Sequence, residues 1–313
     1  MYDSFSAALR VVVPMVILMA AGYLVRVGGT ITRKAMRDYD KVIFRLFMPV
    51  MLFKNIYEID LSQGIAWRDM IFASVCLLVI FAFALKIPRM LTNDGKKYSV
   101  IGQAVLRCNY ILFGVAVSEA LYGEGNSGAV VMLGVLVIPA INILSPVIIE
   151  AGTSGHSSAG KLFAAVLKNP MIIGALLGLA FKALGVNIPP LIWQVIRSIS
   201  NSTTTISFIS LGVGLDMASA VSDRKLLLWG IFLRMCIIPL VFMPLSVLAG
   251  FRGGSLCAMM VVFAAPTAVA SYPMAVAMGA DGDLAGQLVC MTTLLSVITI
   301  FLWTFVLRSM GLL

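Results

Sequence analysis

Three ionisable side chains lie inside long apolar stretches of the sequence: Arg107, Glu119 and Arg234. A charge at the centre of a lipid bilayer costs roughly 2.5–3.5 kcal/mol on insertion scales, so each of these groups needs a partner or water. Two interpretations of Arg107 stand side by side: it attracts an anionic ligand, or it makes a structural ion pair. For Glu119 and Arg234 the structural interpretation is favoured.

A short polar segment interrupts the apolar pattern directly after Arg107. It consists of Cys108, Asn109 and Tyr110, and a shift of 157 residues places Asn109 on Pro266, which Thr267 follows. Proline removes an amide donor and clashes with the preceding helical turn. Carbonyl groups freed in this way are tolerated inside a membrane only beside protein or a polar cavity. Two interrupted helices that cross there would direct helix N-termini at one point, a suitable site for a carboxylate. The alternative is a simple kink at the proline.

A hydroxyl-rich stretch forms a second candidate surface. Ser207 and Ser210 share one face of a predicted helix with Ser200, Thr203 and Gly214, because residues three or four apart lie on the same side. Such a face lines an aqueous path, or it is a seam of small residues for close helix packing. The sequence leaves both interpretations open.

Composition indicates which solvent surrounds these residues. Hydrophobic residues make up 60% of the 313 residues and charged residues 12%, whereas soluble domains carry roughly 25% charged residues. Lipid then requires the apolar stretches to be helical. The net charge of +9 comes from basic residues scattered over short loops, a pattern typical of one membrane face and not of a nucleic-acid site. No catalytic triad, P-loop or metal-ligand spacing occurs, so we expect no enzyme activity, cofactor or bound metal.

The apolar pattern predicts an all-α membrane protein with ten transmembrane helices, joined by short loops with breaker residues. Lysine and arginine are more numerous on one predicted face, which should be cytoplasmic. We therefore expect a multi-pass protein of the cell membrane with both termini outside. The predicted spans are 5–26, 37–57, 67–87, 98–122, 127–150, 161–183, 189–217, 225–249, 255–279 and 284–308.

The sequence also resembles itself weakly at a shift of about 156 residues. Residues 14–17 (PMVI) match residues 170–173 (PMII), and Gly22 falls on Gly178. Each half holds five predicted spans, and an odd number means that the second copy enters the membrane from the opposite side. Inverted repeats of this kind are typical of secondary transporters. We expect the first repeat at residues 1–156 and the second at residues 157–313.

Several motifs occur in a recognisable order. Lys168-Asn169-Pro170 leads through Pro189 to the stretch Ser207–Gly212, and Asn109 leads through Gly114 to Tyr122-Gly123. These motifs and the pair Ala265-Pro266 resemble the auxin efflux carrier family, which includes plant PIN-type exporters and bacterial permeases for small carboxylates. Cys108 stands where PIN-type members have their first crossing proline, and Tyr110 replaces the following threonine.

The resemblance implies a fold like that of bacterial sodium/proton antiporters and bile acid symporters. In that fold, spans 1, 2, 6 and 7 form a dimerising scaffold, and spans 3–5 and 8–10 form a mobile transport domain. The resemblance also implies a homodimer, and it places Asn109 and Pro266 beside the substrate at the crossing of spans four and nine.

The expected function is secondary active transport of a small organic anion, such as a dicarboxylate or an auxin-like acid, by elevator-type alternating access. The alternative is a membrane-embedded sensor that binds its ligand without moving it. The coupling ion is expected to be Na⁺ or H⁺, if there is one. Asp216, near a helix end, is either an ion-coupling residue or a solvated carboxylate. The candidate substrate-binding residues are Arg107, Cys108, Asn109, Tyr110, Ser207, Ser210, Pro266 and Thr267, and the candidate coupling residues are Asp216 and Glu119.

Overall fold

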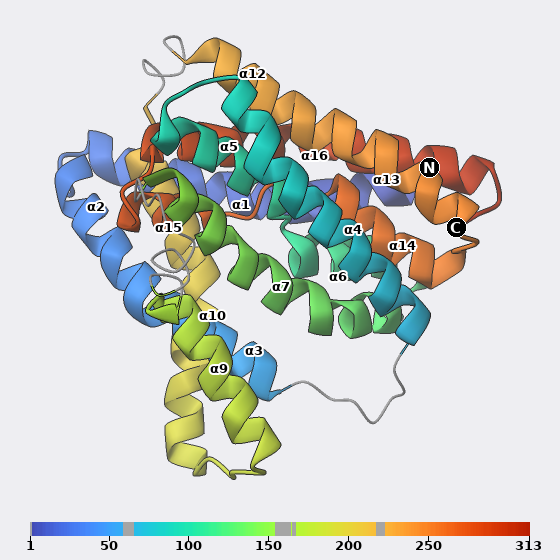
Figure 1. Ribbon diagram of the computed structural model, residues 1–313, viewed down its shortest axis with the longest axis horizontal. Coiled ribbons are helices and arrows are strands. Elements are labelled where there is room, and N and C mark those ends of the chain that lie inside the picture. Colours follow the sequence, from blue (N-terminus) through green and yellow to red (C-terminus); the bar gives the residue numbers. More distant parts are fainter. Residues whose placement is uncertain (1, 59–65, 154–163, 165–166, 217–222) are drawn as a thin grey trace.

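The computed structural model describes residues 2–58, 66–153, 164, 167–216 and 223–313 (Figure 1). Within these ranges the chain consists of helices and connecting loops, without a β-strand. The predicted boundary between the two halves, at residues 156 and 157, lies outside the described residues.

The described helices pack together into a single bundle. The first half contains α1 (Tyr2–Val27), α2 (Arg33–Val42), η1 (Ile43–Phe47), α3 (Met48–Tyr57), α4 (Trp67–Lys86), η2 (Ile87–Met90), α5 (Gly95–Leu106), α6 (Tyr110–Tyr122) and α7 (Gly128–Thr153). The second half contains α9 (Pro170–Ala183), α10 (Pro190–Gly214), α12 (Arg224–Phe232), η3 (Leu233–Ile237), α13 (Ile238–Leu248), α14 (Gly253–Ala264), α15 (Ser271–Ala277) and α16 (Gly282–Ser309).

The described helices suit a multi-pass membrane protein. Five of them are long and apolar enough to cross a bilayer, and α6, α9 and α14 are shorter apolar helices. Large apolar side chains such as Leu24, Ile71 and Leu191 are more than half exposed, which is expected of surfaces that face lipid. The count of ten spans stays a prediction.

Polar caps fix where several helices begin. Thr32 accepts a hydrogen bond from the amide of Ala35 at 3.1 Å, so the second predicted span begins at Arg33 and not at residue 37. Asn169 caps α9 through the amide of Met171 at 2.9 Å, and Pro170 follows it. Proline is suited to a first helical position because the amide there has no partner within the helix. Within the sixth predicted span, 161–183, α9 therefore begins at Pro170.

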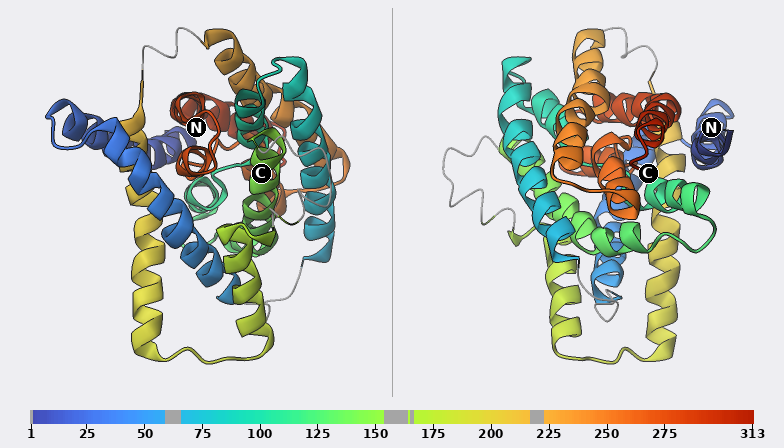
Figure 2. Two further views of the ribbon diagram at one scale, coloured as in Figure 1. Left: turned by 60° about the vertical axis from the view of Figure 1, so that its left-hand side comes forward. Right: turned by 90° about the vertical axis from the view of Figure 1, so that its right-hand side faces the viewer.

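Close helix contacts in the bundle depend on glycine. A methyl group on Gly22 of α1 would lie 2.1 Å from the carbonyl oxygen of Ile209, and one on Gly212 of α10 would lie 2.0 Å from that of Met19. Figure 2 shows α9 and α10 extending together beyond the rest of the bundle, with α3 beside them. Gly174 of α9 is in similar backbone contact with α3. Gly174 and Gly178, which form a G-x-x-x-G pair in α9, therefore allow close packing of this helix on α3.

The α1–α10 seam gives a test of this packing. Gly212→Ala should lower the free energy of unfolding by roughly 1–3 kcal/mol, the usual cost of overpacking, because the new Cβ would overlap the Met19 carbonyl. Gly128→Ala, at a position with no atom within 4 Å, is the matched control. Thermal unfolding of the purified protein in detergent measures both, and equal melting temperatures for the two variants would contradict the seam.

Candidate functional site

Two helices are interrupted, and their interruptions cross. The first lies between α5 and α6, and the second lies between α14 and α15. Cys108 and Thr267 face each other in an isolated antiparallel bridge. The amide of Asn109 donates to the Pro266 carbonyl at 2.8 Å, and the amide of Ala268 donates to the Arg107 carbonyl at 3.0 Å. Each interruption thus supplies hydrogen-bond partners for the other, in the positions that the sequence placed opposite each other.

Arg234 holds the two helix ends that run into the crossover. Its guanidinium group donates to the carbonyl groups of Val105 (3.0 Å), Val262 (3.0 Å) and Ala265 (2.6 and 2.9 Å). The last carbonyls of a helix have no partner inside it, and a cation is favoured beside the negative end of a helix dipole. Arg234 is fully buried, and it serves the C-terminal ends of α5 and α14 at once. Its role is structural.

The helix that leaves the first interruption begins at a cavity. Asn109 precedes α6, its side chain makes no capping hydrogen bond, and its Nδ2 atom is buried without a partner. The cavity beside it has a volume of about 120 Å³. It is lined by Met51, Asn55, Arg107, Cys108, Asn109, Tyr110, Ile111, Leu112, Ile138, Ile141, Asn142, Thr204, Ala268, Val269 and Ala270.

Arg107 is the cation of this cavity. It is only 2% exposed, its Nη2 atom donates to Oδ1 of Asn142 at 2.5 Å, and its Nη1 atom lies 3.3 Å from the sulfur of Met274. Its Nε atom has no hydrogen-bond partner. Among the described residues no carboxylate is paired with it, so the structural ion pair considered for this residue is not formed.

Asn142 is the site residue that the sequence analysis missed. It lies in α7, 3% exposed, and its amide nitrogen donates to the Ile138 carbonyl at 2.8 Å. That bond orients Oδ1 toward Arg107. The available signal was a single asparagine in a largely apolar span, between Pro139 and Pro146.

The other predicted residues of the crossover are placed differently. Cys108 and Tyr110 line the cavity, but the phenol of Tyr110 donates to the Val130 carbonyl at 2.9 Å. Thr267 is fully buried, and its hydroxyl donates to the Ala104 carbonyl at 3.1 Å. Pro266 contributes its carbonyl to the crossing. Thr267 therefore supports the crossover backbone, while Cys108 and Tyr110 also shape the cavity.

The hydroxyl side chains of α10 fall into two groups, one in helix packing and one in a cavity wall. The hydroxyl of Ser207 donates to the Thr203 carbonyl at 2.7 Å, and that of Ser210 donates to Oδ1 of Asp40. Neither serine lines the crossover cavity. Ser200 and Thr204 line a second cavity of about 600 Å³, so α10 contributes both packing contacts and a cavity wall.

The second cavity lies beside the first, and the two share part of their wall. Arg10 and Lys54 are the charged residues of its wall. The two cavities have Met51, Asn55, Ile111, Leu112 and Thr204 in common. Arg10 and Lys54, the latter paired with Glu58 at 2.7 Å, therefore lie in the wall of the cavity next to the one that holds Arg107.

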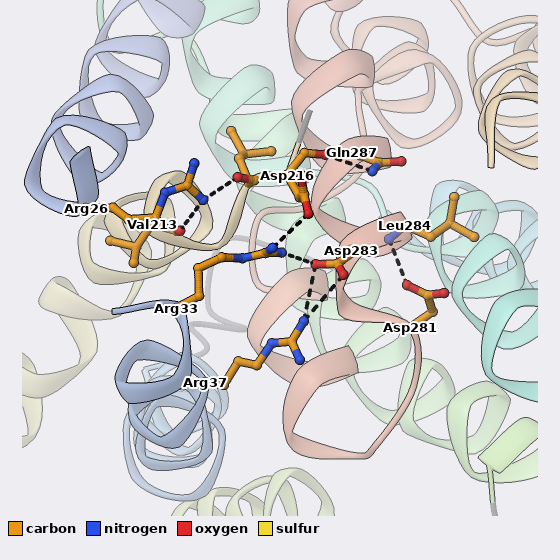
Figure 3. Close-up of polar contacts among 10 residues, drawn as sticks. Arg26, Arg33, Arg37, Val213, Asp216, Asp281, Asp283, Leu284 and Gln287 are labelled. Carbon is orange, nitrogen blue, oxygen red and sulfur yellow. Dashed lines mark hydrogen bonds and ion pairs between the residues drawn. The ribbon is translucent and has the colours of Figure 1, made fainter. Parts of the chain in front are cut away.

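An ionic cluster joins helix ends elsewhere in the bundle (Figure 3). Arg33 of α2 pairs with Asp216, which follows α10, at 2.8 Å, and with Asp283 of α16 at 2.5 Å. Arg37 pairs with Asp283 at 3.3 Å. Asp216, whose side chain is 32% exposed, is thus part of an ion-pair cluster. Glu119 lies near the far end of α6, where Oε1 accepts from the amide of Gly125 at 3.4 Å, and it does not line either cavity.

Comparison with known proteins agrees with this geometry. A sequence profile of the family described as "Membrane transport protein", the auxin efflux carriers, matches residues 7–161 and residues 154–304. The chain belongs to the auxin efflux carrier family. An "Uncharacterized transporter" of Methanothermobacter thermautotrophicus (strain Delta H) is 22% identical over 324 residues, covering 97% of this carrier chain and 99% of the relative. The resemblance read from the motifs is confirmed, and the family is one of membrane transport proteins, not of enzymes.

Arg234 of the carrier yields a stability prediction. Arg234→Met removes every hydrogen bond that it makes to Val105, Val262 and Ala265, and each buried group left unpaired costs about 1–3 kcal/mol. We expect a loss of roughly 3 kcal/mol or more, seen as a collapse of monodisperse yield and a lower melting temperature. Arg234→Lys should be intermediate, because it keeps the charge.

The matched control for this prediction is Arg197→Met. The Arg197 side chain is 57% exposed and pairs with Glu58 at 3.5 Å, and exposed pairs contribute only about 0–1 kcal/mol. If both variants lost the same small amount of stability, Arg234 would not be the group that holds the crossover together.

Proposed function

We propose that this family member is a secondary active transporter that moves a small organic anion through the crossover by elevator-type alternating access. The observation that carries the proposal is Arg107, a buried cation without a carboxylate partner among the described residues. An uncompensated buried charge costs several kcal/mol. An anionic ligand supplies the missing countercharge, and it does so only while it is bound.

The groups around Arg107 favour a carboxylate. Nε of Arg107 and Nδ2 of Asn109 are both buried donors without an acceptor. A carboxylate offers two oxygens that accept hydrogen bonds from guanidinium and amide donors. The start of α6, directly after Asn109, adds amide groups and a positive dipole end that favour the same anion.

The size and lining of the cavity restrict the rest of the molecule. Its volume of about 120 Å³ is well below the ~300–1,000 Å³ of a drug-sized site. Among the described lining residues Arg107 is the one formal cation, and Ile138, Ile141 and Val269 contribute an apolar wall. We therefore favour a short acid with one anchored carboxylate and an apolar body. A second carboxylate would have to remain near Arg10 and Lys54 in the wider cavity.

The elevator part of the proposal is supported by where the cavity lies. One wall comes from α3 and α10, through Met51, Asn55 and Thr204, and the other comes from the two interrupted helices and α7. The seams between α1 and α10 and between α3 and α9 contain glycines in backbone contact, which suits a rigid scaffold. The crossover would then move along α3 and α10 and carry the anion with it.

The direct test is transport by the purified full chain in lipid vesicles. Radiolabelled short monocarboxylates and dicarboxylates are offered with a membrane potential, a sodium gradient or a pH gradient. Accumulation above protein-free vesicles is expected for at least one monocarboxylate. Absence of movement under every gradient would sink the proposal, and binding without movement would instead indicate a membrane-embedded sensor.

Arg107 gives the test of the site. A hydrogen bond to a charged group contributes about 1.5–3 kcal/mol, so Arg107→Gln should weaken binding of a transported monocarboxylate roughly 10- to 150-fold. Binding of the corresponding neutral amide should hardly change. Arg10→Gln, in the wall of the wider cavity, is the control and should have a smaller effect. Equal losses for acid and amide would assign Arg107 to structure alone.

The ionic cluster gives the test of the movement. In the proposed mechanism α16 moves relative to α2, so the pairs from Arg33 and Arg37 to Asp283 must break. Partly exposed pairs contribute about 0.2–1 kcal/mol each, and Asp283→Asn should therefore shift the conformational equilibrium roughly two- to thirtyfold away from this state.

A cysteine at Thr204, which lines both cavities, reports the shift through its rate of labelling by an impermeant thiol reagent. The five native cysteines are first replaced by alanine. Asp38→Asn is the control, because Asp38 pairs with Lys41 on the same helix. An unchanged labelling rate in Asp283→Asn would mean that the cluster does not restrain the movement.

A further inference from the structure

Asp40 of α2 is a buried carboxyl group that the crossover site does not use. Its side chain is completely enclosed. Oδ1 accepts a hydrogen bond from the hydroxyl of Ser210 on α10, and Oδ2 is buried without a hydrogen-bond partner. It takes part in none of the ion pairs formed by the described residues.

The groups that face Asp40 come from three helices. Arg37 lies on its own helix, Ser210 lies on α10, and the phenol of Tyr272 approaches from α15 without forming a hydrogen bond of standard geometry to Oδ2. Beyond Tyr272 lie Arg33 and Asp283, which pair with each other at 2.5 Å. Because Arg37 also pairs with Asp283, neither arginine is committed to Asp40.

This environment favours a neutral carboxyl group. Moving an isolated carboxylate out of water costs far more free energy than one hydrogen bond from a hydroxyl group recovers. Such a group therefore takes up a proton instead. A metal cation is a poorer explanation, because hard cations need about six oxygen ligands. The described residues contain no cluster of three or more acidic, histidine or cysteine side chains, and the oxygen atoms that face Asp40 among them are the hydroxyls of Ser210 and Tyr272.

The burial of Asp40 depends on how α15 is seated. The hydroxyl of Tyr272 would lie 1.7 Å from a methyl group on Gly214 of α10, and its ring would lie 3.3 Å from one on Gly286 of α16. The slot that Tyr272 occupies therefore depends on glycine at position 214, and Gly286 leaves room for the ring. The same short helix carries Met274, which contacts Arg107 in the crossover. A displacement of the crossover would withdraw Tyr272 from this slot and expose Asp40 to water.

We propose that Asp40 is the proton-binding site of the carrier. Asp40 holds a proton while α15 covers it. When α15 withdraws, the O–H bond of Asp40 breaks, the proton passes to water, and a carboxylate remains. Low pH then stabilises the conformation seen here, and rising pH favours the displaced one. That this proton is the coupling ion of anion transport rests on the proposed function; the proton site itself does not.

Infrared difference spectroscopy of the purified full chain tests the proton directly. At mildly acidic pH, where the proposal has Asp40 protonated, the unmodified protein should show the carbonyl band of a buried carboxylic acid that is missing in Asp40→Asn. Asp38→Asn, with a carboxylate paired to Lys41 on the protein surface, should leave the band in place. Ser210→Ala should shift the band without removing it, because it deletes only the hydrogen bond to Oδ1. An identical spectrum for Asp40→Asn and the unmodified protein would show an ionised Asp40 and overturn the proposal.

Labelling of the Thr204→Cys protein tests the link to conformation without any substrate. The rate is divided by that of a fully exposed reference thiol at the same pH, because the reactive thiolate fraction itself rises with pH. This ratio, for labelling from the side of Arg10 and Lys54, should fall by up to about tenfold for each pH unit once Asp40 loses its proton, since one proton is linked to the change. In Asp40→Asn the ratio should stay at its low-pH value at every pH. A ratio in the parent that does not depend on pH, or the same pH dependence in Asp40→Asn, would refute the link.

Transport measurements then separate the two proposals. If Asp40 titrates and controls labelling but no organic acid moves, the proposed function fails and the proton site stands. If a monocarboxylate moves, and Asp40→Asn retains the same response to a pH gradient as the unmodified protein, the carrier stands and Asp40 is not its coupling site.

Discussion

The architecture depends on backbone hydrogen bonding where two helices stop in the middle of an apolar bundle. A helix that ends in lipid leaves amide and carbonyl groups without partners, at a cost of several kcal/mol each. Here the two interruptions satisfy each other, through the pairs Asn109–Pro266 and Ala268–Arg107. Proline suits its position in this arrangement, because Pro266 needs to supply only a carbonyl group.

Two buried arginines lie at the crossover, and they differ in the groups that they contact. Arg234 donates hydrogen bonds to carbonyl groups at the ends of α5 and α14, so the negative ends of two helix dipoles offset its charge. Arg107 has an asparagine, a methionine sulfur and an unpaired Nε atom. The same side chain is therefore structural in one position and available to a ligand in the other. The difference comes from the acceptors that surround each one.

Small residues and ion pairs hold together the helices that surround the crossover. Glycines hold α1 to α10 and α3 to α9 at backbone contact, while the crossover meets α3 and α10 across a cavity. A cavity wall has fewer interatomic contacts than a packed seam, so it is the easier boundary along which helices move. The Arg33–Asp283 pair and the Asp40–Ser210 contact connect α2 to α16 and α10, and the first of these would have to break if the crossover moved along that boundary.

The sequence by itself determined the membrane environment, the helical class, the family and the positions of both interruptions. These follow from composition, from breaker residues and from motifs, which are local properties that a bilayer makes decisive. Only the tertiary structure decided which polar groups meet. Asn142 lies beside Arg107, Ser210 beside Asp40 and Arg234 beside three distant carbonyls. Such contacts join helices far apart in the chain, and no spacing within one helix encodes them.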